Sequence, residues 1–162
     1  MIGFKTMANH ITSIKVGDKA PDFKGKDQDG KIISLKDFKG KKLVLYFYPK
    51  DNTPGCTLQA CNLRDNYSAL LKKGYAIVGV SADDEIKHKK FIEKYSLPFP
   101  LLADIDKTIL KAYDVWGKKK FLGKVYDGII RTTFVIDESG KIEKVISDVK
   151  TTNHTAQILE SN

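Results

Sequence analysis

The chain has 162 residues, 41% of them hydrophobic and 30% charged, with two cysteines and a formal net charge of +8. A single domain of this size buries a full core without metal or disulfide staples. No apolar run reaches 18 residues, which excludes a membrane-spanning helix of ordinary length.

The positive charge is spread along the chain and mixed with acidic residues. Lysines recur in four separate places, at residues 24–26, 39–42, 87–90 and 118–120. We find no helix-turn-helix, zinc finger or other nucleic-acid module around them. The pattern indicates a solvated lysine-rich surface with a weak attraction for acidic partners, and no nucleic-acid function.

The N-terminal residues carry little pattern. Residues 1–14 are predicted to be a flexible segment, followed by one domain over residues 15–162. The first seven residues lack the apolar core of a signal peptide, so we expect a cytoplasmic protein, and Met1 and Met7 are both candidate starts.

The elements that open the domain are a hairpin, a helical turn and a buried strand. Asp29-Gly30 predicts the turn of a small hairpin over residues 27–35, and residues 34–40 predict one capped helical turn. Residues 42–48 form an almost unbroken β-branched and aromatic run, which is typical of a strand buried on both faces of a sheet.

Both cysteines lie just after this strand. Apolar residues at roughly helical spacing predict a helix from near Thr53 to Lys73, which places Cys56 in its first turn. Free backbone N–H groups and the helix dipole stabilise a thiolate there, and the thiolate is the nucleophilic form. Pro49 and Pro54 stiffen the loop. The loop therefore presents Cys56 as a reactive thiol rather than as a small buried hydrophobe.

The remaining elements alternate between strands and helices. Residues 75–81 predict a second buried strand, which with the preceding helix makes a right-handed βαβ unit. We expect a helix starting at residues 81–85 and reaching Tyr95, and a short strand within residues 97–102. The rest of the chain predicts a helix over residues 106–113, a basic loop over 116–124 with Trp116 at the domain edge, a hairpin over 130–137 and 141–146, and a closing helix over 153–159.

The loop motif Pro49-x-x-x-Thr53-x-x-Cys56 resembles the active-site signature of the peroxiredoxins, and Cys61 resembles the second cysteine of the peroxiredoxin Q or bacterioferritin comigratory protein branch. The similarity extends over residues 14–159 and includes 15–23, 127–137 and 149–154. It implies an α/β thioredoxin-like fold, with a central mixed sheet flanked by helices and an N-terminal β-hairpin extension. Gln59 is a departure, because many relatives carry glutamate there, and it puts an acid/base role at this position in doubt.

The resemblance also implies a mechanism and its residues. Cys56 would be the peroxidatic nucleophile that attacks hydrogen peroxide or an organic hydroperoxide, with Thr53 and Arg131 holding the peroxide and Pro49 shielding the sulfenate. Cys61 would resolve the sulfenic acid by forming an intramolecular disulfide, which thioredoxin or a similar dithiol reduces. The resemblance implies no metal and no organic cofactor, and a monomer because the disulfide is internal.

Helix geometry sets a condition on that disulfide. Five residues of ideal helix separate two Cα atoms by about 8.5 Å, whereas a disulfide requires them within about 7 Å. A bond between Cys56 and Cys61 therefore requires the first turns of the helix to unwind. An inert, packed Cys61 is the alternative.

Arg131 and the histidines also carry alternative interpretations. Arg131 lies in an otherwise apolar strand, where a charge needs a partner; a structural ion pair is its alternative. Arg64 is the rival cation, but it lies about 80° around the helix from Cys56. The histidines, His10, His88 and His154, show no zinc-like spacing with the cysteines and are predicted to be surface residues, so we predict no metal site.

Two other functions are compatible with parts of the sequence. A thioredoxin-like disulfide oxidoreductase would use Cys-x-x-Cys, whereas this chain has four residues between its cysteines. A non-enzymatic binding or chaperone-like module would use the basic surface and would not need Cys56. Peroxide reduction accounts for more of the motif than either.

Overall fold

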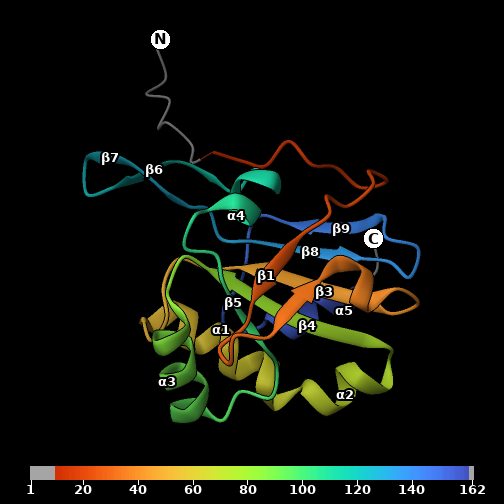
Figure 1. The fold of residues 1–162 in the computed structure, drawn as a ribbon. Coiled ribbons are helices and arrows are strands. Elements are labelled where there is room, and N and C mark those ends of the chain that lie inside the picture. The colour runs from red at the N-terminus through yellow and green to blue at the C-terminus, as the bar shows by residue number, and fades with distance from the viewer. Residues whose placement is uncertain (1–9, 161–162) are drawn as a thin grey trace.

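The computed structural model describes residues 10–160 and contains a five-stranded mixed sheet in the order β5-β4-β3-β8-β9. Strands β3, β4 and β5 run parallel, and β8 and β9 are antiparallel to their neighbours. The strands are β3 (Lys42–Phe47), β4 (Tyr75–Ser81), β5 (Leu101–Ala103), β8 (Thr132–Ile136) and β9 (Ile142–Ile146) (Figure 1).

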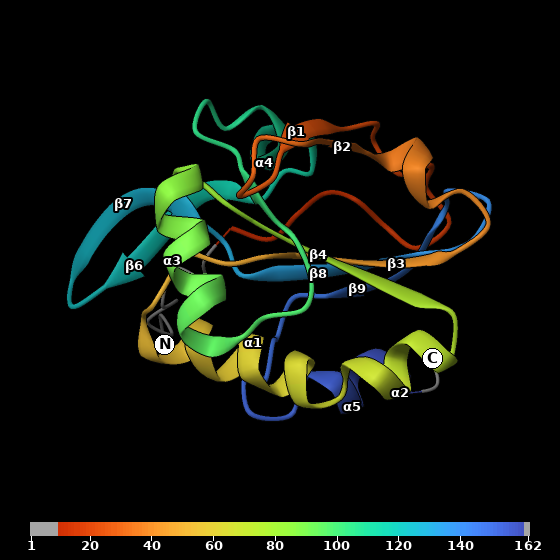
Figure 2. The same cartoon turned by 60° about the horizontal axis from the view of Figure 1, so that its bottom comes forward.

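Helices cover both faces of this sheet (Figure 2). One face carries α1 (Pro54–Asp65), α2 (Tyr67–Lys72), α3 (Glu85–Tyr95) and α5 (His154–Leu159). The other carries α4 (Thr108–Ala112) and an N-terminal hairpin of β1 (Lys24–Lys26) and β2 (Ile32–Ser34), followed by a 3₁₀ turn at Leu35–Phe38. The predicted mixed α/β fold with an N-terminal hairpin is confirmed.

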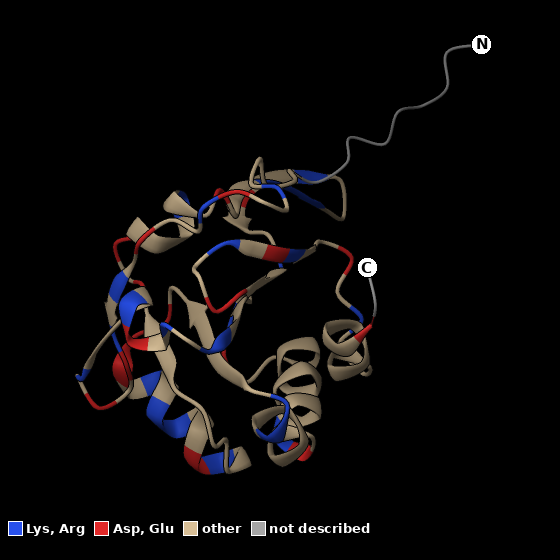
Figure 3. Ribbon diagram, turned by 90° about the vertical axis from the view of Figure 1, so that its right-hand side faces the viewer, with Lys and Arg blue, Asp and Glu red and all other residues tan. Residues whose placement is uncertain are grey.

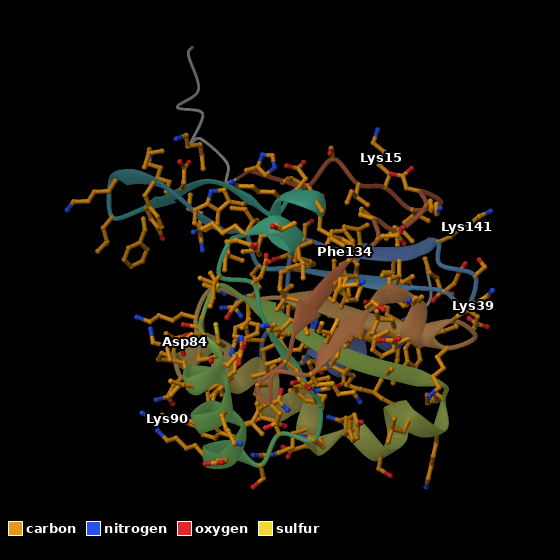
Figure 4. The ribbon with its side chains drawn as sticks, in the orientation of Figure 1. Lys15, Lys39, Asp84, Lys90, Phe134 and Lys141 are labelled. Carbon is orange, nitrogen blue, oxygen red and sulfur yellow. The ribbon has the colours of Figure 1, made fainter. Side chains whose placement is uncertain are left out.

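Strand β3 is the centre of the core. Its successive side chains point to opposite faces of the sheet, and both faces are buried. One cluster contains Leu43, Leu45 and Phe47, and the other contains Val44, Tyr46 and the following residue Tyr48. Phe134 of the neighbouring β8 lies inside the first cluster, as Figure 4 shows. The unbroken apolar run thus reflects burial on both sides, as predicted.

The single helix predicted over residues 53–73 is two helices. Helix α1 ends at Asp65, and Asn66 leaves the helical conformation with φ −108° and ψ 9° before α2 begins. The Asn66 side-chain amide donates to the carbonyl of Asn62, 2.8 Å away. Asparagine competes with helical backbone bonds in this way, and the apolar spacing on either side hid the break.

The basic loop predicted over residues 116–124 is a second hairpin, β6 (Trp116–Phe121) and β7 (Lys124–Ile129), which projects from the body in Figure 1. Its turn consists of Leu122 and Gly123, both with positive φ, as in the turns that match strand twist. The lysines of β6 mask the alternation that identifies a strand. Trp116 is half-buried against the core, in agreement with its predicted edge position.

Residues 10–14 contact the domain, contrary to the expectation of a flexible segment through residue 14. The Thr12 hydroxyl donates to the carbonyl of Tyr113, and the Ser13 amide donates to the Asp114 carboxylate. His10 lies 2.8 Å from the same carboxylate. Residues 1–9 of the predicted segment lie outside the described residues.

The charged side chains are distributed over most elements of the fold. Basic and acidic segments are scattered over the helices and loops (Figure 3), and labelled lysines such as Lys15 and Lys90 point away from the body (Figure 4). No helix within residues 10–160 is long and apolar enough to cross a membrane.

Candidate active site

Cys56 lies at the start of α1, beyond the C-terminal end of the central strand β3. Thr53 precedes the helix in an extended conformation, Pro54 is its first residue, and Cys56 is its third. Proline suits that first position because its missing N–H would have no helical partner. The thiol is 1% exposed, so the substrate must reach a sulfur that is almost covered.

Arg131 contacts the sulfur. It directly precedes β8, whose first residue, Thr132, pairs with Phe47 at the end of β3. One terminal nitrogen of the guanidinium donates to Cys56 Sγ over 3.3 Å. A cationic donor at this distance stabilises negative charge on the sulfur. The predicted juxtaposition of Arg131 and Cys56 is present, and among residues 10–160 Arg131 forms no ion pair with a carboxylate.

Gln59 holds the other arm of the guanidinium. Its Oε1 accepts from the second terminal nitrogen of Arg131 over 2.6 Å, while its buried Nε2 has no partner. Because the amide is neutral, Arg131 keeps its full charge for the sulfur. From the sequence, Gln59 was only a departure from the family pattern; its position three residues after Cys56, on the same helix face, was the signal of its role.

Gly55 makes room for the guanidinium. A Cβ at this position would lie 3.3 Å from the Arg131 nitrogen that faces the sulfur. A side chain there would require the guanidinium to shift by a few tenths of an ångström. The glycine thus favours the close approach of Arg131 to the first turn of α1.

Thr53 is the N-cap residue of α1, but its hydroxyl does not cap the helix. It donates to the carbonyl of Lys50 over 2.8 Å, so it must rotate to donate to a bound oxygen. Pro49 lines an open depression of about 510 Å³ together with Arg131 and Lys119.

Lys119 is a second cation near the site, in a stretch that was expected to be a solvated loop. Partial burial lowers its pKa, the nearby charge of Arg131 lowers it further, and Cys56 acts in the opposite direction. The hairpin that carries Lys119 was not predicted, so no sequence signal placed this lysine beside Cys56.

Cys61 lies in the same continuous helix as Cys56, and both thiols are free. The next residue, Asn62, is held by the segment that leads into α5. Its side-chain amide donates to the carbonyl of Thr152, and its Oδ1 accepts from the Thr155 amide over 2.8 Å. The helix is thus fixed from outside just after Cys61.

The prediction that all three histidines lie on the surface is wrong for two of them. His88 and His154 are both 0% exposed. His154 Nε2 lies 2.8 Å from the Thr133 hydroxyl, and its Nδ1 lies 3.0 Å from Gln157 Oε1. Burial lowers the pKa of His154, the Gln157 bond opposes this, and the Arg131 charge adds to the lowering. Their polar sequence neighbours concealed both positions.

His88 belongs to the one group within residues 10–160 whose donor atoms are close enough to hold a metal ion, together with Asp51 and Asp83. These atoms already bond one another and neighbouring protein groups: Asp51 bonds His88 Nδ1, and Asp83 accepts from the Asp51 amide and the Ser81 hydroxyl. We therefore describe the group as a hydrogen-bond network.

Arg64, the rival cation, is engaged elsewhere. Its guanidinium lies 2.9 Å from the Asp65 carboxylate and donates to the carbonyl of Tyr95 over 2.7 Å. It ties α1 to the end of α3 instead of contacting Cys56.

Comparison with protein families identifies this arrangement. The AhpC/TSA family matches residues 16–145. The chain belongs to this family. Peroxiredoxin Bcp of Escherichia coli strain K12 is 50% identical over 149 residues, which cover 92% of this chain and 96% of that protein. Peroxiredoxin Bcp of Bacillus subtilis strain 168 is 47% identical over 149 residues, covering 92% and 95%.

Solved structures agree with the sequence relatives. Peroxiredoxin Q of Xanthomonas campestris superposes with a TM-score of 0.81 at 32% identity, covering 91% of this chain and 94% of that one. A structure concerned with alkyl peroxide reduction by the bacterioferritin comigratory protein of the same organism gives 0.81 at 32%, covering 92% and 95%. A cysteine-to-serine mutant of Xylella fastidiosa PrxQ gives 0.85 at 29% identity, covering 92% and 95%. The predicted peroxiredoxin Q/Bcp membership and thioredoxin-like fold are confirmed, and this peroxiredoxin is a thiol peroxidase.

Proposed function

We propose that Cys56 is the peroxidatic residue and that this peroxiredoxin reduces hydrogen peroxide and organic hydroperoxides. The Cys56 thiolate attacks the terminal oxygen, the O–O bond breaks, and the leaving oxygen takes a proton and departs as water or an alcohol. Cys56 becomes a sulfenic acid. The observation that carries this assignment is the Arg131 contact to Cys56 Sγ at 3.3 Å.

The neighbouring groups stabilise the charge that shifts during this step. Arg131 faces the sulfur and the reacting oxygen, and Thr53, after rotation of its hydroxyl, donates to the peroxide. Pro49 limits access to the sulfenate and so protects it from further oxidation. The depression beside Arg131 has a mixed lining, in which Ile11, Ile130 and Val149 offer apolar surface to an alkyl group, in line with the alkyl peroxide activity studied in the X. campestris relative.

In the second step Cys61 resolves the sulfenic acid. Its thiol sulfur attacks Cys56, a disulfide forms, the S–O bond breaks, and the oxygen leaves as water. Because both residues lie in α1, the turns between them must unwind first. A dithiol protein such as thioredoxin then returns two electrons by disulfide exchange. Since this disulfide is internal, the enzyme acts as a monomer, and a reducing cytoplasm is its compartment.

The test is thiol titration and non-reducing mass spectrometry after one equivalent of hydrogen peroxide, on wild type, Cys56→Ser and Cys61→Ser. We expect the wild-type monomer to lose two thiols rapidly and gain an internal disulfide. The Cys61→Ser variant should stop at a sulfenic acid, and Cys56→Ser should not react.

The opposite outcomes are equally clear. Survival of both wild-type thiols would refute the proposed role of Cys56 and favour dithiol exchange. A Cys61→Ser variant that still turns over with thioredoxin at the wild-type rate would show that Cys61 does not resolve.

A further inference from the structure

Asp51 is the centre of a buried hydrogen-bond network beneath the reactive loop. It lies two residues before Thr53 and is 8% exposed. Its Oδ1 accepts from the Tyr48 hydroxyl over 2.5 Å, and its Oδ2 lies 2.6 Å from His88 Nδ1. Its backbone amide donates to the Asp83 carboxylate over 2.8 Å. One loop residue is thus tied to Tyr48, which directly follows β3, to α3, and to the segment that follows β4.

The partners of His88 fix where its protons lie. Its Nε2 is 2.8 Å from the carbonyl of Leu102, and because a carbonyl only accepts, Nε2 carries a proton. A further proton must lie between Nδ1 and the Asp51 carboxylate, since otherwise two acceptors would face each other at 2.6 Å. Burial, then the Asp51 charge, raises the pKa of Tyr48 well above its ordinary value, so its hydroxyl remains a donor. The contacts of Asp51 with Tyr48, of Asp51 with His88 and of His88 with Leu102 therefore each join a donor to an acceptor inside the protein.

The other end of α3 holds the next loop residue. Asn52 adopts a left-handed conformation with φ 60°, and its Oδ1 accepts from Lys94 Nζ and from the Tyr95 hydroxyl, each over 3.2 Å. A left-handed asparagine is maintained only when its surroundings hold it. Helix α3 thus contacts the reactive loop at two successive residues.

We propose that the Asp51–His88 pair is a positioning device that fixes the reactive loop for attack on the peroxide. Neither side chain touches the substrate. The pair holds the backbone between Pro49 and Thr53, and so fixes the position from which the Thr53 hydroxyl rotates towards a bound oxygen. Misplacement of such a group by a fraction of an ångström lowers the rate of the peroxide reaction without removing the thiolate.

The pair has a second effect, on the disulfide step. Unwinding of α1 must stop somewhere upstream of Cys56. Going back along the chain from Cys56, Asp51 is the first residue whose backbone and side chain both bond to distant residues. The loop through Asp51 therefore stays in place while the helix behind it opens. When the disulfide is reduced, α1 reforms from a preceding loop that has kept its position.

This inference rests on the proposed function, and the first experiment separates the two. Second-order rate constants for the reaction of Cys56 with hydrogen peroxide and with iodoacetamide are measured in a Cys61→Ser background. We expect Asp51→Ala and His88→Ala each to slow the peroxide reaction about tenfold. The double variant should be no slower than either single variant, because the two residues act as one pair. Alkylation needs no aligned peroxide, so its rate and pH profile should stay within twofold of the background protein.

Two further variants separate positioning from general damage. In Asp51→Asn the new amide accepts from Tyr48 and donates to neutral His88, so the rate should fall by less than about threefold. Asp104→Asn is the matched control, because Asp104 is also buried but accepts from the amides of Ile109 and Leu110 at the start of α4. It should lower the melting temperature and leave the peroxide rate unchanged.

Three outcomes are distinguishable. If the background protein reacts with peroxide but Asp51→Ala and His88→Ala react as fast, the positioning role is wrong and the proposed function stands. If Asp51→Ala and His88→Ala instead speed alkylation, and Asp104→Asn slows the peroxide reaction as much as they do, the network is only structural. If the background protein does not react with peroxide, the proposed function fails first.

Hydrogen exchange tests the second effect in the wild-type enzyme. The Asp51 amide should remain protected in both the reduced and the disulfide forms, while amides of residues 57–61 lose protection on oxidation. In His88→Ala, oxidation should expose the Asp51 amide as well. Loss of its protection in oxidised wild type would show that the loop moves with the helix.

Discussion

The reactive segment differs from its two flanks in how it is held. Upstream, Asp51 bonds to Tyr48, to Asp83 and to His88 of α3, and downstream, Asn62 bonds to the start of α5. Between them, residues 54–61 are held by their own helical bonds, by the burial of Cys56, Gln59 and Ala60, and by Arg131, which donates to Cys56 and Gln59. The difference teaches that side-chain bonds to distant segments flank the turns that contain both cysteines, which are the turns that would unwind in the proposed disulfide step.

The two flanks also use their buried histidines differently. His88, upstream, shares a proton with a carboxylate, whereas His154, downstream, bonds only neutral groups, Thr133 and Gln157. Burial of the downstream histidine lowers its pKa, so acid should weaken that flank.

The largest effect should come from the long-range contact between Arg131 and the sulfur. Arg131→Met removes the donor to Cys56 Sγ and leaves Gln59 Oε1 unpaired, so we expect the peroxide rate constant to fall about 100-fold. Stopped-flow kinetics in the Cys61→Ser background measures it. Arg64→Met is the matched control, since Arg64 bonds Asp65 and Tyr95 instead. An equal loss in the control would contradict the assignment.

A smaller effect should come from changing helix stability between the cysteines. Leu58 is 50% exposed in α1, so Leu58→Gly acts mainly through the lower helix propensity of glycine, about 1 kcal/mol. If unwinding limits the disulfide step, the rate of disulfide formation should rise about fivefold. Quenched mass spectrometry measures this rate as the loss of the sulfenic acid with time.

Two controls belong to this measurement. Leu58→Ala shortens the side chain but keeps a strong helix former, and Ser68→Gly makes the glycine change in α2, outside the segment. Neither should speed the disulfide step. Acceleration by Ser68→Gly equal to that by Leu58→Gly would mean that unwinding is not confined between the flanks.

The smallest effect concerns the pH dependence of stability. The pKa of His154 lies below its ordinary value of 6.5, chiefly because of burial. The unfolded chain therefore binds the proton more readily, and stability present above pH 6.5 is lost as the pH falls below it. We expect the fall in Tm between pH 7 and pH 5 to be smaller in His154→Gln than in wild type, by on the order of one or two degrees. An equal fall in Tm between pH 7 and pH 5 for wild type and variant would contradict this prediction.

Local patterns determined much of this peroxiredoxin. The buried run of β3, the turn at Asp29-Gly30 and the position of Cys56 at a helix start depend on residues adjacent in sequence, so they were predictable. The motif Pro49-x-x-x-Thr53-x-x-Cys56 identified the family for the same reason. The conflict between a continuous helix and a bond from Cys56 to Cys61 also followed from spacing alone.

Only the tertiary structure decided which distant groups surround these residues. Lys119 comes beside Cys56 through a hairpin whose lysines hide its alternation, and Gln59 acts through Arg131, 72 positions away. His88 is flanked by lysines in sequence, yet the packing of α3 against the loop buries it against Asp51. A polar side chain is buried when the fold supplies its partners, and those partners lie on other elements, out of reach of any local pattern.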